Sequence, residues 1–313
     1  MKKLRVLLAA FAAIPMTCAT SFANSAPQGA GRTIVTVLPA KAGEQSVRVP
    51  LQDLAVKVDG KQVTATGWTP LRGDRTEIVL LIDDSARATL GTQWGDLTRF
   101  VNELPSNTKI AIAYMEEGRA VLEGPLSANP AKAASELHLP LGIPGESASP
   151  YFCLSDLARH WPSTDSGARR VVVMVTDGVD YYEMRYDPYD PYVQAAIKDS
   201  VQAGLQVYSI YWLNRGFADR TFYENYAGQN LLAELTEATG GVSYWEGLGN
   251  PESFDPYFKD LRRRLRNQYA LSFTVPAEKK PELAGFELKS DDRSAKVDAP
   301  QEVWISAQKE PGK

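Results

Sequence analysis

The sequence is poor in cysteine and histidine, the residues that most often build metal and redox sites, with two of each in 313 residues. Cys18 lies in an N-terminal segment that we expect to be removed, so only Cys153 would remain and no disulfide could form within the chain. Neither His138 nor His160 has a metal-ligand spacing or a nucleophile signature nearby. The chain also lacks a G-x-S-x-G turn, a Walker loop, an H-E-x-x-H helix and a complete dinucleotide fingerprint, so no common enzyme motif is present.

Long hydrophobic runs are also missing beyond the N-terminus. No later stretch reaches the ~18 apolar residues that a membrane-spanning helix needs. The first residues combine a basic start, an apolar run over 6–14 and a small-x-small site ending at Ala23. This pattern predicts a secretory signal peptide over residues 1–23, and hence a protein exported to the periplasm or the extracellular space.

The charge balance is acidic. Cleavage after Ala23 would remove three of the 34 basic residues and none of the 38 acidic ones, which leaves 31 against 38 and a net charge of −7. An acidic chain of this kind is a poor partner for nucleic acids and for anionic membrane surfaces.

Two β-rich segments flank an alternating region. Between residues 76 and 267, hydrophobic strands alternate with helices of 3.6-residue period, which predicts an α/β fold with a Rossmann-like, doubly wound, mostly parallel sheet. Residues 33–75 and 268–306 read as strands, with a type I′ turn favoured at Asp59-Gly60. We expect these two segments to pack together as a small β annex, because neither has enough strands to be stable alone.

Oxygen-bearing side chains follow two of the predicted strands. Asp83, Asp84 and Ser85 come directly after the hydrophobic run 77–82, and Thr176-Asp177 ends a second run. In open α/β sheets, ligands bind outside the carboxyl ends of the strands. Hard divalent cations such as Mg²⁺ prefer these oxygen ligands.

The same residues resemble a known family. Asp83-x-Ser85 and Thr176-Asp177-Gly178-x-Asp180 are similar to motifs of von Willebrand factor type A (VWA) domains, and two further segments resemble the exported bacterial branch of that family, Leu235-x-x-Ala238-Thr239-Gly240-Gly241 and Arg266-Asn267-Gln268-Tyr269. The resemblance extends over about residues 33–306. It implies a metal-ion-dependent adhesion site that holds Mg²⁺ or Mn²⁺, with Asp83, Ser85, Ser149 and Asp177 as ligands and with Asp84 and Asp180 in an outer shell.

Arg87 departs from this family pattern, because it stands where the second serine of the motif is expected. A guanidinium has no lone pair to offer a metal and stays charged at ordinary pH. Two arrangements remain open. Arg87 points to solvent and leaves a weak metal site, or it folds onto Asp83 or Asp177 and replaces the ion with a buried ion pair.

A tyrosine-rich segment follows the third metal motif. Four of its tyrosines are candidate partner-binding residues: Tyr181, Tyr182, Tyr186 and Tyr189. Tyrosine gives a large contact area at low entropic cost, which suits a recognition loop. The alternative is a solvated loop with some rings packed on the domain. A basic run at Arg262, Arg263, Arg264 and Arg266 is interpreted as a solvated helix face near a helix end.

These observations favour an exported module for protein–protein interaction or adhesion, with a degenerate metal site that a carboxylate of a protein partner could complete. We do not expect an enzyme. Two alternatives stay open: a metal-assisted phosphohydrolase that uses the same acids, and a scaffold without a metal.

Overall fold

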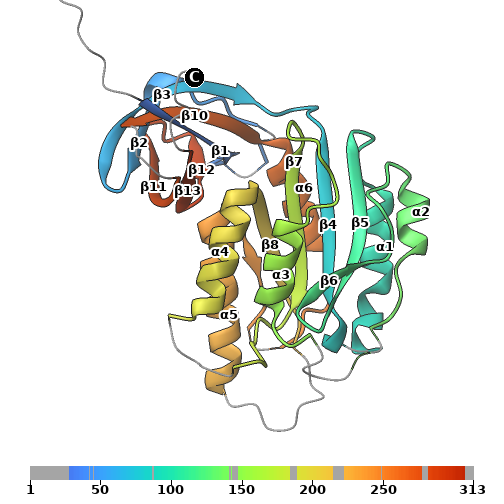
Figure 1. Cartoon of the computed structure of the whole chain (residues 1–313). Coiled ribbons are helices and arrows are strands. Elements are labelled where there is room, and N and C mark those ends of the chain that lie inside the picture. The colour runs from blue at the N-terminus through green and yellow to red at the C-terminus, as the bar shows by residue number, and fades with distance from the viewer. Residues whose placement is uncertain are drawn as a thin grey trace, which may run out of the picture.

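In a computed structural model, the chain folds around two β-sheets, one of six strands and one of seven (Figure 1). The structure describes residues 28–306 except for 42, 45, 87, 141, 143–146, 184–188, 214–221, 248 and 277–280. The predicted signal peptide, Arg87 and Tyr186 therefore lie outside the described residues. Within the described part, no helix is long and apolar enough to cross a membrane.

The six-stranded sheet is mostly parallel and has the order β6-β5-β4-β7-β8-β9. Strand β4, one of the two central strands, is completely buried, because it consists of a hydrophobic run covered on both faces. The antiparallel strand β6 lies at one edge. The strands are β4 (Thr76–Asp83), β5 (Thr108–Glu116), β6 (Arg119–Leu122), β7 (Arg169–Thr176), β8 (Leu205–Tyr211) and β9 (Ser243–Tyr244).

Helices cover both faces of this sheet (Figure 1). One face packs against α1 (Trp94–Asn102), α2 (Pro130–Ser135) and α6 (Asp255–Arg266). The other packs against α3 (Pro150–Arg159), α4 (Pro191–Ala203) and α5 (Phe222–Thr239). The prediction of a mixed α/β fold with a parallel sheet is thereby confirmed.

The seven-stranded sheet is antiparallel, with the order β12-β1-β10-β3-β2-β11-β13. Strands β1, β2 and β3 come from the N-terminal part of the chain, and strands β10, β11, β12 and β13 come from the C-terminal part. They enclose a core of their own that includes Val35, Phe273 and Phe286. Their bounds are β1 (Gln28–Pro39), β2 (Leu54–Val58), β3 (Lys61–Pro70), β10 (Gln268–Pro276), β11 (Glu282–Ser290), β12 (Ala295–Asp298) and β13 (Glu302–Ile305).

Two local features of this sheet follow from the sequence. Asp59 and Gly60 join β2 to β3 with φ values of 47° and 74°, which is the positive-φ pair that a type I′ turn requires. Strand β1 is longer than the predicted run of residues 33–38, because it pairs with β10 from Gln28 onwards.

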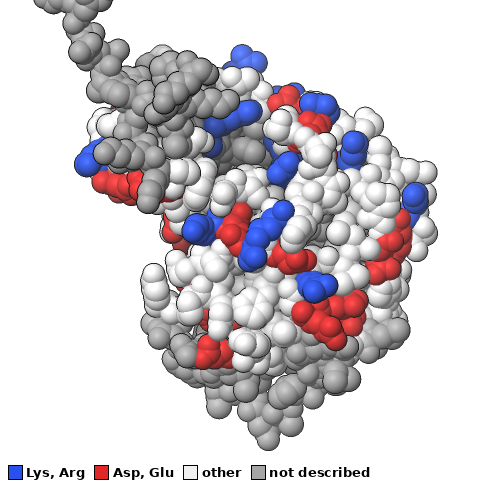
Figure 2. Space-filling model, in the orientation of Figure 1, with Lys and Arg blue, Asp and Glu red and all other residues white. Residues whose placement is uncertain are grey.

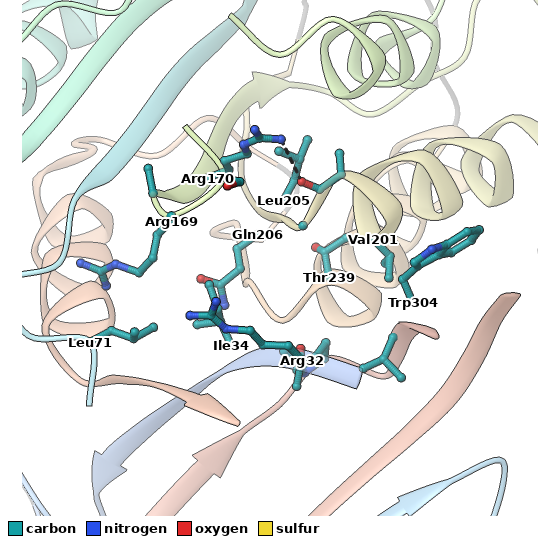
Figure 3. A pocket seen from close by; sticks show the side chains of 18 of the residues that line it. Arg32, Ile34, Leu71, Arg169, Arg170, Val201, Leu205, Gln206, Thr239 and Trp304 are labelled. Atoms are coloured by element: carbon teal, nitrogen blue, oxygen red, sulfur yellow. Dashed lines mark hydrogen bonds between the residues drawn. The ribbon is translucent and has the colours of Figure 1, made fainter. Parts of the chain in front are cut away.

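Buried polar side chains connect the two sheets. Arg169, at the start of β7, donates to Gln268 Oε1 at 2.7 Å and to Thr76 Oγ1 at 2.7 Å. The Nε2 of Gln268 then donates to Gln206 Oε1 at 2.7 Å. Figure 3 shows Arg169 and Gln206 between the six-stranded sheet and β1. This chain of hydrogen bonds joins β4, β7 and β8 to β10, and it lies at the amino end of the parallel strands.

Candidate functional site

Asp83 is the last residue of β4, and its carboxylate accepts three hydrogen bonds. Its Oδ1 accepts from the backbone nitrogen of Ser85 at 3.0 Å and from Ser85 Oγ at 2.5 Å. Its Oδ2 accepts from Thr176 Oγ1 at 2.7 Å. The chain continues from Asp83 into a short 3₁₀ helix, Asp84–Ala86, which turns Ser85 back onto the carboxylate. Asp83 and Ser85 are each 1% exposed.

Asp177 lies on the neighbouring strand end, directly after β7. Its Oδ1 accepts from the backbone nitrogen of Val179 at 3.0 Å, and its Oδ2 accepts from the hydroxyl of Tyr181 at 3.1 Å. Gly178 adopts φ 70°, and a Cβ on Gly228 of α5 would lie 2.2 Å from the carbonyl oxygen of Asp177. Helix α5 therefore packs directly on the backbone of this loop and fixes the position of Asp177.

Ser149 reaches the same edge from a third segment. It precedes Pro150, which is the first residue of α3 as the sequence predicts. The preceding residue, Ala148, has φ 59° and a carbonyl oxygen that accepts from the backbone nitrogens of Tyr181 at 3.0 Å and Tyr182 at 2.8 Å. The loop that carries Ser149 is thereby held against the loop that follows Asp177.

The carboxyl group of Asp83 is costly to ionise. Burial and the charge of Asp177 raise the pKa of Asp83 to about 6, although its hydrogen bonds from Ser85 and Thr176 lower it. Burial, followed by the charges of Asp190, Asp180 and Asp177, also raises the pKa of the Tyr151 hydroxyl well above its usual value. Several carboxylates therefore gather in a poorly solvated region at the carboxyl edge of the sheet.

The two residues expected in an outer shell are both buried in this region. Asp84 is 8% exposed and Asp180 is 3% exposed. Asp180 Oδ1 accepts from the backbone nitrogens of Tyr182 at 2.9 Å and Glu183 at 3.3 Å, which shapes the loop after Asp177. Burial raises the pKa of Asp180, whereas the nearby hydroxyl of Ser149 and these two amides lower it.

The donor set fits a hard divalent cation. Two carboxylates and two hydroxyls, all of them buried, supply only oxygen atoms, which is what Mg²⁺ and Mn²⁺ prefer. Ser149 Oγ and Asp180 Oδ2 are buried and have no hydrogen-bond partner of good geometry within the described part of the chain. The described residues contain no group of three or more His, Cys, Asp or Glu side chains that could hold a metal, so the hydroxyls would have to contribute.

The tyrosines of the predicted recognition loop divide into two kinds. Tyr181 is partly buried and donates to Asp177, so it belongs to the site itself. Tyr182 is 66% exposed and Tyr189 is 71% exposed. The Tyr182 ring lies against two further rings, 5.3 Å from Phe152 and 6.0 Å from Tyr192 between centroids.

No role could be assigned to Thr176 from the sequence, although the residue belongs to the motif that includes Asp177. The parallel register pairs Ile82 with Val175, so the next residues, Asp83 and Thr176, lie side by side at the same edge. The sequence contains a signal for this contact, because both strands are hydrophobic runs of the same length that end in a polar residue.

Comparisons with known proteins find remote similarity to solved structures. No protein-family model matches the sequence, and no curated protein matches it. An aerotolerance-related membrane protein of Bacteroides fragilis is similar in structure, with 16% identity and a TM-score of 0.41, over 61% of this chain and 98% of that one. The vWF domain of the type V pili tip protein Mfa5 of Porphyromonas gingivalis has 12% identity and a TM-score of 0.39, over 60% and 95% of the two chains.

A third similar structure is the proximal thread matrix protein 1 of the mussel byssus, with 14% identity and a TM-score of 0.42, over 66% of this chain and 49% of that one. A further structure of that mussel protein has a zinc-occupied MIDAS motif. These proteins have VWA-type folds, the family that the sequence motifs resemble. The likeness concerns the fold alone.

Proposed function

We propose that this chain is an exported VWA-type interaction module whose carboxyl-edge site takes up Mg²⁺ or Mn²⁺ and, through it, a carboxylate of a protein partner. The α/β part over 76–267 would be the module, and the strands of 33–75 and 268–306 would form its β annex. The signal pattern at residues 1–23 supports export to the periplasm or the extracellular space.

The pairing of Asp83 with Asp177 carries this proposal. Two ionised carboxylates in a buried position repel each other, and burial, together with the charge of Asp177, raises the pKa of Asp83. The charge of Asp177 therefore adds to the cost of ionising Asp83. A bound divalent cation would reverse the balance, since both carboxylates would then face a positive charge.

The chain's own residues would divide the work of holding the ion. Asp83 and Asp177 would supply charge, and Ser85 and Ser149 would supply neutral oxygens. Thr176 would orient Asp83 through its 2.7 Å hydrogen bond. A cation with few charged ligands remains electrophilic and can accept a carboxylate from a partner, so binding would need no covalent step.

Tyr182 and Tyr189 would contact the partner protein around the carboxylate that binds the metal. Both rings are exposed, and the ring of Tyr182 contacts those of Phe152 and Tyr192. Large rings that are already held in place lose little conformational freedom on binding, which suits a recognition surface.

Calorimetric titration of Mg²⁺ and Mn²⁺ into the exported chain tests the metal. We expect saturable binding that disappears in Asp83→Asn and Asp177→Asn. Asp156→Asn serves as the matched control, because Asp156 lies on α3 away from the edge and pairs with His160 at 3.0 Å. Absence of binding in the wild type would leave the metal-free scaffold, or an ion pair that involves Arg87, as the explanation.

A phosphohydrolase would give a different result in the same preparations. Turnover of a generic phosphoester in the presence of Mg²⁺, lost in both Asp83→Asn and Asp177→Asn but kept in Asp156→Asn, would replace the interaction module with an enzyme. We expect no turnover, together with partner binding that EDTA abolishes.

A further inference from the structure

A cleft of about 800 Å³ lies at the opposite, amino end of the parallel strands. Helix α6 forms one wall, and the turns that precede β4 and β5 form the other. Thr76 and Thr108, the first residues of those two strands, lie along it. Six basic side chains and two acidic ones line the cleft: Arg72, Arg169, Lys259, Arg262, Arg263 and Arg266 against Glu44 and Glu103.

The arginine run of α6 is not a uniform solvated face. Arg264 points inward, is 8% exposed, and donates to Asp260 at 2.6 Å and to Asp298 at 2.8 Å. Arg263 and Arg266 line the cleft instead, and neither makes an ion pair with a described carboxylate. The interpretation of the run as a solvated face is therefore incomplete, because Arg264 is buried in ion pairs and Arg263 and Arg266 line a cleft.

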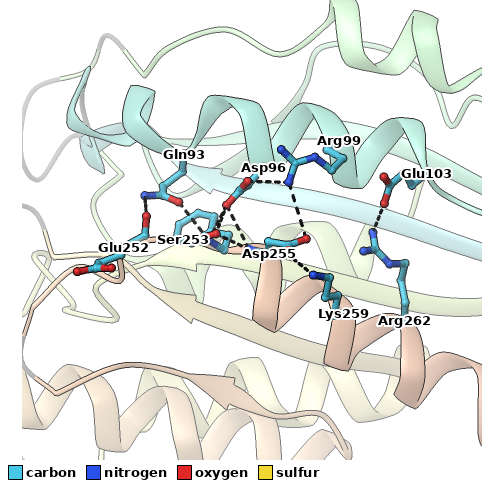
Figure 4. A network of polar contacts seen from close by, with 10 residues as sticks. Gln93, Asp96, Arg99, Glu103, Glu252, Ser253, Asp255, Lys259 and Arg262 are labelled. Carbon is cyan, nitrogen blue, oxygen red and sulfur yellow. Dashed lines mark hydrogen bonds and ion pairs between the residues drawn. The ribbon is translucent and has the colours of Figure 1, made fainter. Parts of the chain in front are cut away.

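Two basic residues of the cleft are partly neutralised, one by a carboxylate at the end of α1 and one by a carboxylate of α6 itself (Figure 4). Arg262 lies 3.2 Å from Glu103, and Lys259 lies 2.6 Å from Asp255. On the facing turn, Arg72 is exposed and has no ion pair among the described residues. Three arginines, Arg72, Arg263 and Arg266, are left with charges that no described carboxylate pairs.

Arg169 adds a fixed charge to the same cleft. It is 8% exposed and its hydrogen bonds go to uncharged acceptors, the carbonyls of Leu265 and Asp74 and the side chains of Gln268 and Thr76. Burial lowers its pKa, while the charge of Asp74 acts in the opposite direction. The positive charge of Arg169 is thus held in place by dipoles and not cancelled by an ion pair.

The rest of the described surface offers two comparisons with this cleft. The whole chain has a net charge of −4, and on the face seen in Figure 2 basic and acidic side chains are interspersed. A smaller cavity of about 290 Å³ on the other side of Arg169 (Figure 3) is lined by two acidic side chains, Asp74 and Glu302, and by three basic ones, Arg32, Arg169 and Arg170. Its charges are therefore closer to balance than those of the larger cleft, which has six basic against two acidic side chains.

We propose that the cleft between α6 and the turns before β4 and β5 binds a compact multivalent anion that carries phosphate or carboxylate groups. Guanidinium groups match the paired oxygens of both, and several of them facing one space favour a ligand with more than one anionic group. This site is separate from the carboxyl-edge site, because the two lie at opposite ends of the same strands.

Calorimetric titrations of tripolyphosphate and of citrate into the exported chain, in buffer free of divalent cations, test the site. We expect at least one of them to bind saturably, and to bind more weakly as ionic strength rises. Arg263→Gln/Arg266→Gln should weaken that binding about tenfold or more, since each 1.4 kcal/mol corresponds to tenfold. Arg72→Gln should weaken it too, and it leaves α6 untouched.

The matched control is Arg119→Gln/Arg159→Gln, which removes two exposed charges from β6 and α3 and should change affinity less than twofold. Asp83→Asn should bind the anion normally, so failure of the metal proposal and failure of this one remain distinguishable. Binding of tripolyphosphate alone would assign phosphate chemistry, and binding of citrate alone would assign carboxylate chemistry. Binding of neither anion to the wild type, or equal losses in the cleft variants and the control, would overturn the proposal.

Discussion

The two ends of the parallel sheet bury charge in opposite ways. At the carboxyl end, Asp83 and Asp177 are buried side by side with like charges, and the pKa of Asp83 rises to about 6. At the amino end, Arg169 is buried with its guanidinium hydrogen-bonded to Gln268, Thr76 and two backbone carbonyls. At the carboxyl end, burial and a neighbouring charge oppose the ionisation of Asp83, whereas the amino end is largely satisfied by hydrogen bonds within the chain.

This difference separates a site from a structural connection. Buried polar groups that are satisfied internally rigidify a fold, whereas buried like charges persist only where something else compensates them. The amino end joins the two sheets, so its disruption should reduce stability. At the carboxyl end we expect the opposite effect on stability, since removing one of the carboxylate charges should stabilise the chain in the absence of metal.

The largest effect is expected at the amino end. Arg169→Met should lower the free energy of unfolding by about 3 kcal/mol, because it leaves buried acceptors on Gln268 and Thr76 without a donor. Urea unfolding measures the change. Arg170→Gln is the neighbouring control, and it should lose less than about 1 kcal/mol, since Arg170 is only partly buried.

The double replacement Arg169→Met/Gln268→Leu sharpens this prediction. If the loss in Arg169→Met comes from unsatisfied partners, the double variant should lose less than the sum of the two single changes. Strict additivity would show that the two side chains do not act as one connection.

At the carboxyl end, Asp83→Asn should stabilise the metal-free chain by about 2 kcal/mol at pH 7, because asparagine removes the repelled charge and keeps an acceptor for Ser85. Thermal and urea unfolding in EDTA measure this gain. A clear loss of stability would mean that the charge of Asp83 is compensated within the chain, and the contrast between the two ends would fail.

The stability that the metal-free chain gains from Asp83→Asn should depend on pH. The pKa of Asp83 is raised in the folded state from 3.8 to about 6, so the folded state binds the proton more tightly. The stability that comes from this proton is fully present below pH 3.8 and is lost as pH rises through about 6. The advantage of Asp83→Asn over the wild type should therefore be small near pH 4 and grow to its full size above pH 6. Taking the difference between the two proteins removes the contributions of other carboxyl groups.

The smallest effect on stability is expected for the exposed rings. Tyr182→Ser/Tyr189→Ser should change the free energy of unfolding by no more than about 0.5 kcal/mol, because both side chains are largely in solvent. The metal titration should also be unchanged. Weakened binding of a partner that wild-type protein binds in an EDTA-sensitive manner would then assign the rings to recognition. A large loss of stability would show instead that they are structural.

Much of the architecture could be predicted from the sequence. The hydrophobic runs ending in Asp83 and Thr176 predicted parallel strands, and Asp59-Gly60 predicted a type I′ turn, because both signals are local. The loop at Ser149 could be placed before α3 from Pro150 alone. Its contact with the loop after Asp177 depends on backbone bonds from Ala148 to residues more than thirty positions away, which periodicity does not encode.

The roles of the arginines could not be predicted for the same reason. Arg262, Arg263, Arg264 and Arg266 look alike in the sequence. Only the tertiary structure shows that Arg264 forms buried ion pairs and that the other three line a cleft, where Arg262 also pairs with Glu103. Gln268 was noted as part of a family-like motif, but its connection to Arg169 depends on strands about a hundred residues apart.

The most direct test of the central claim is a map of Mn²⁺ binding by paramagnetic broadening of backbone amide signals. We expect the amides of Ser85, Ser149 and Gly178 to broaden together at low Mn²⁺. Asp83→Asn should abolish this effect, while the amides around Arg169 stay sharp in both proteins. Broadening elsewhere in the chain, or equal broadening in Asp83→Asn, would contradict the central claim.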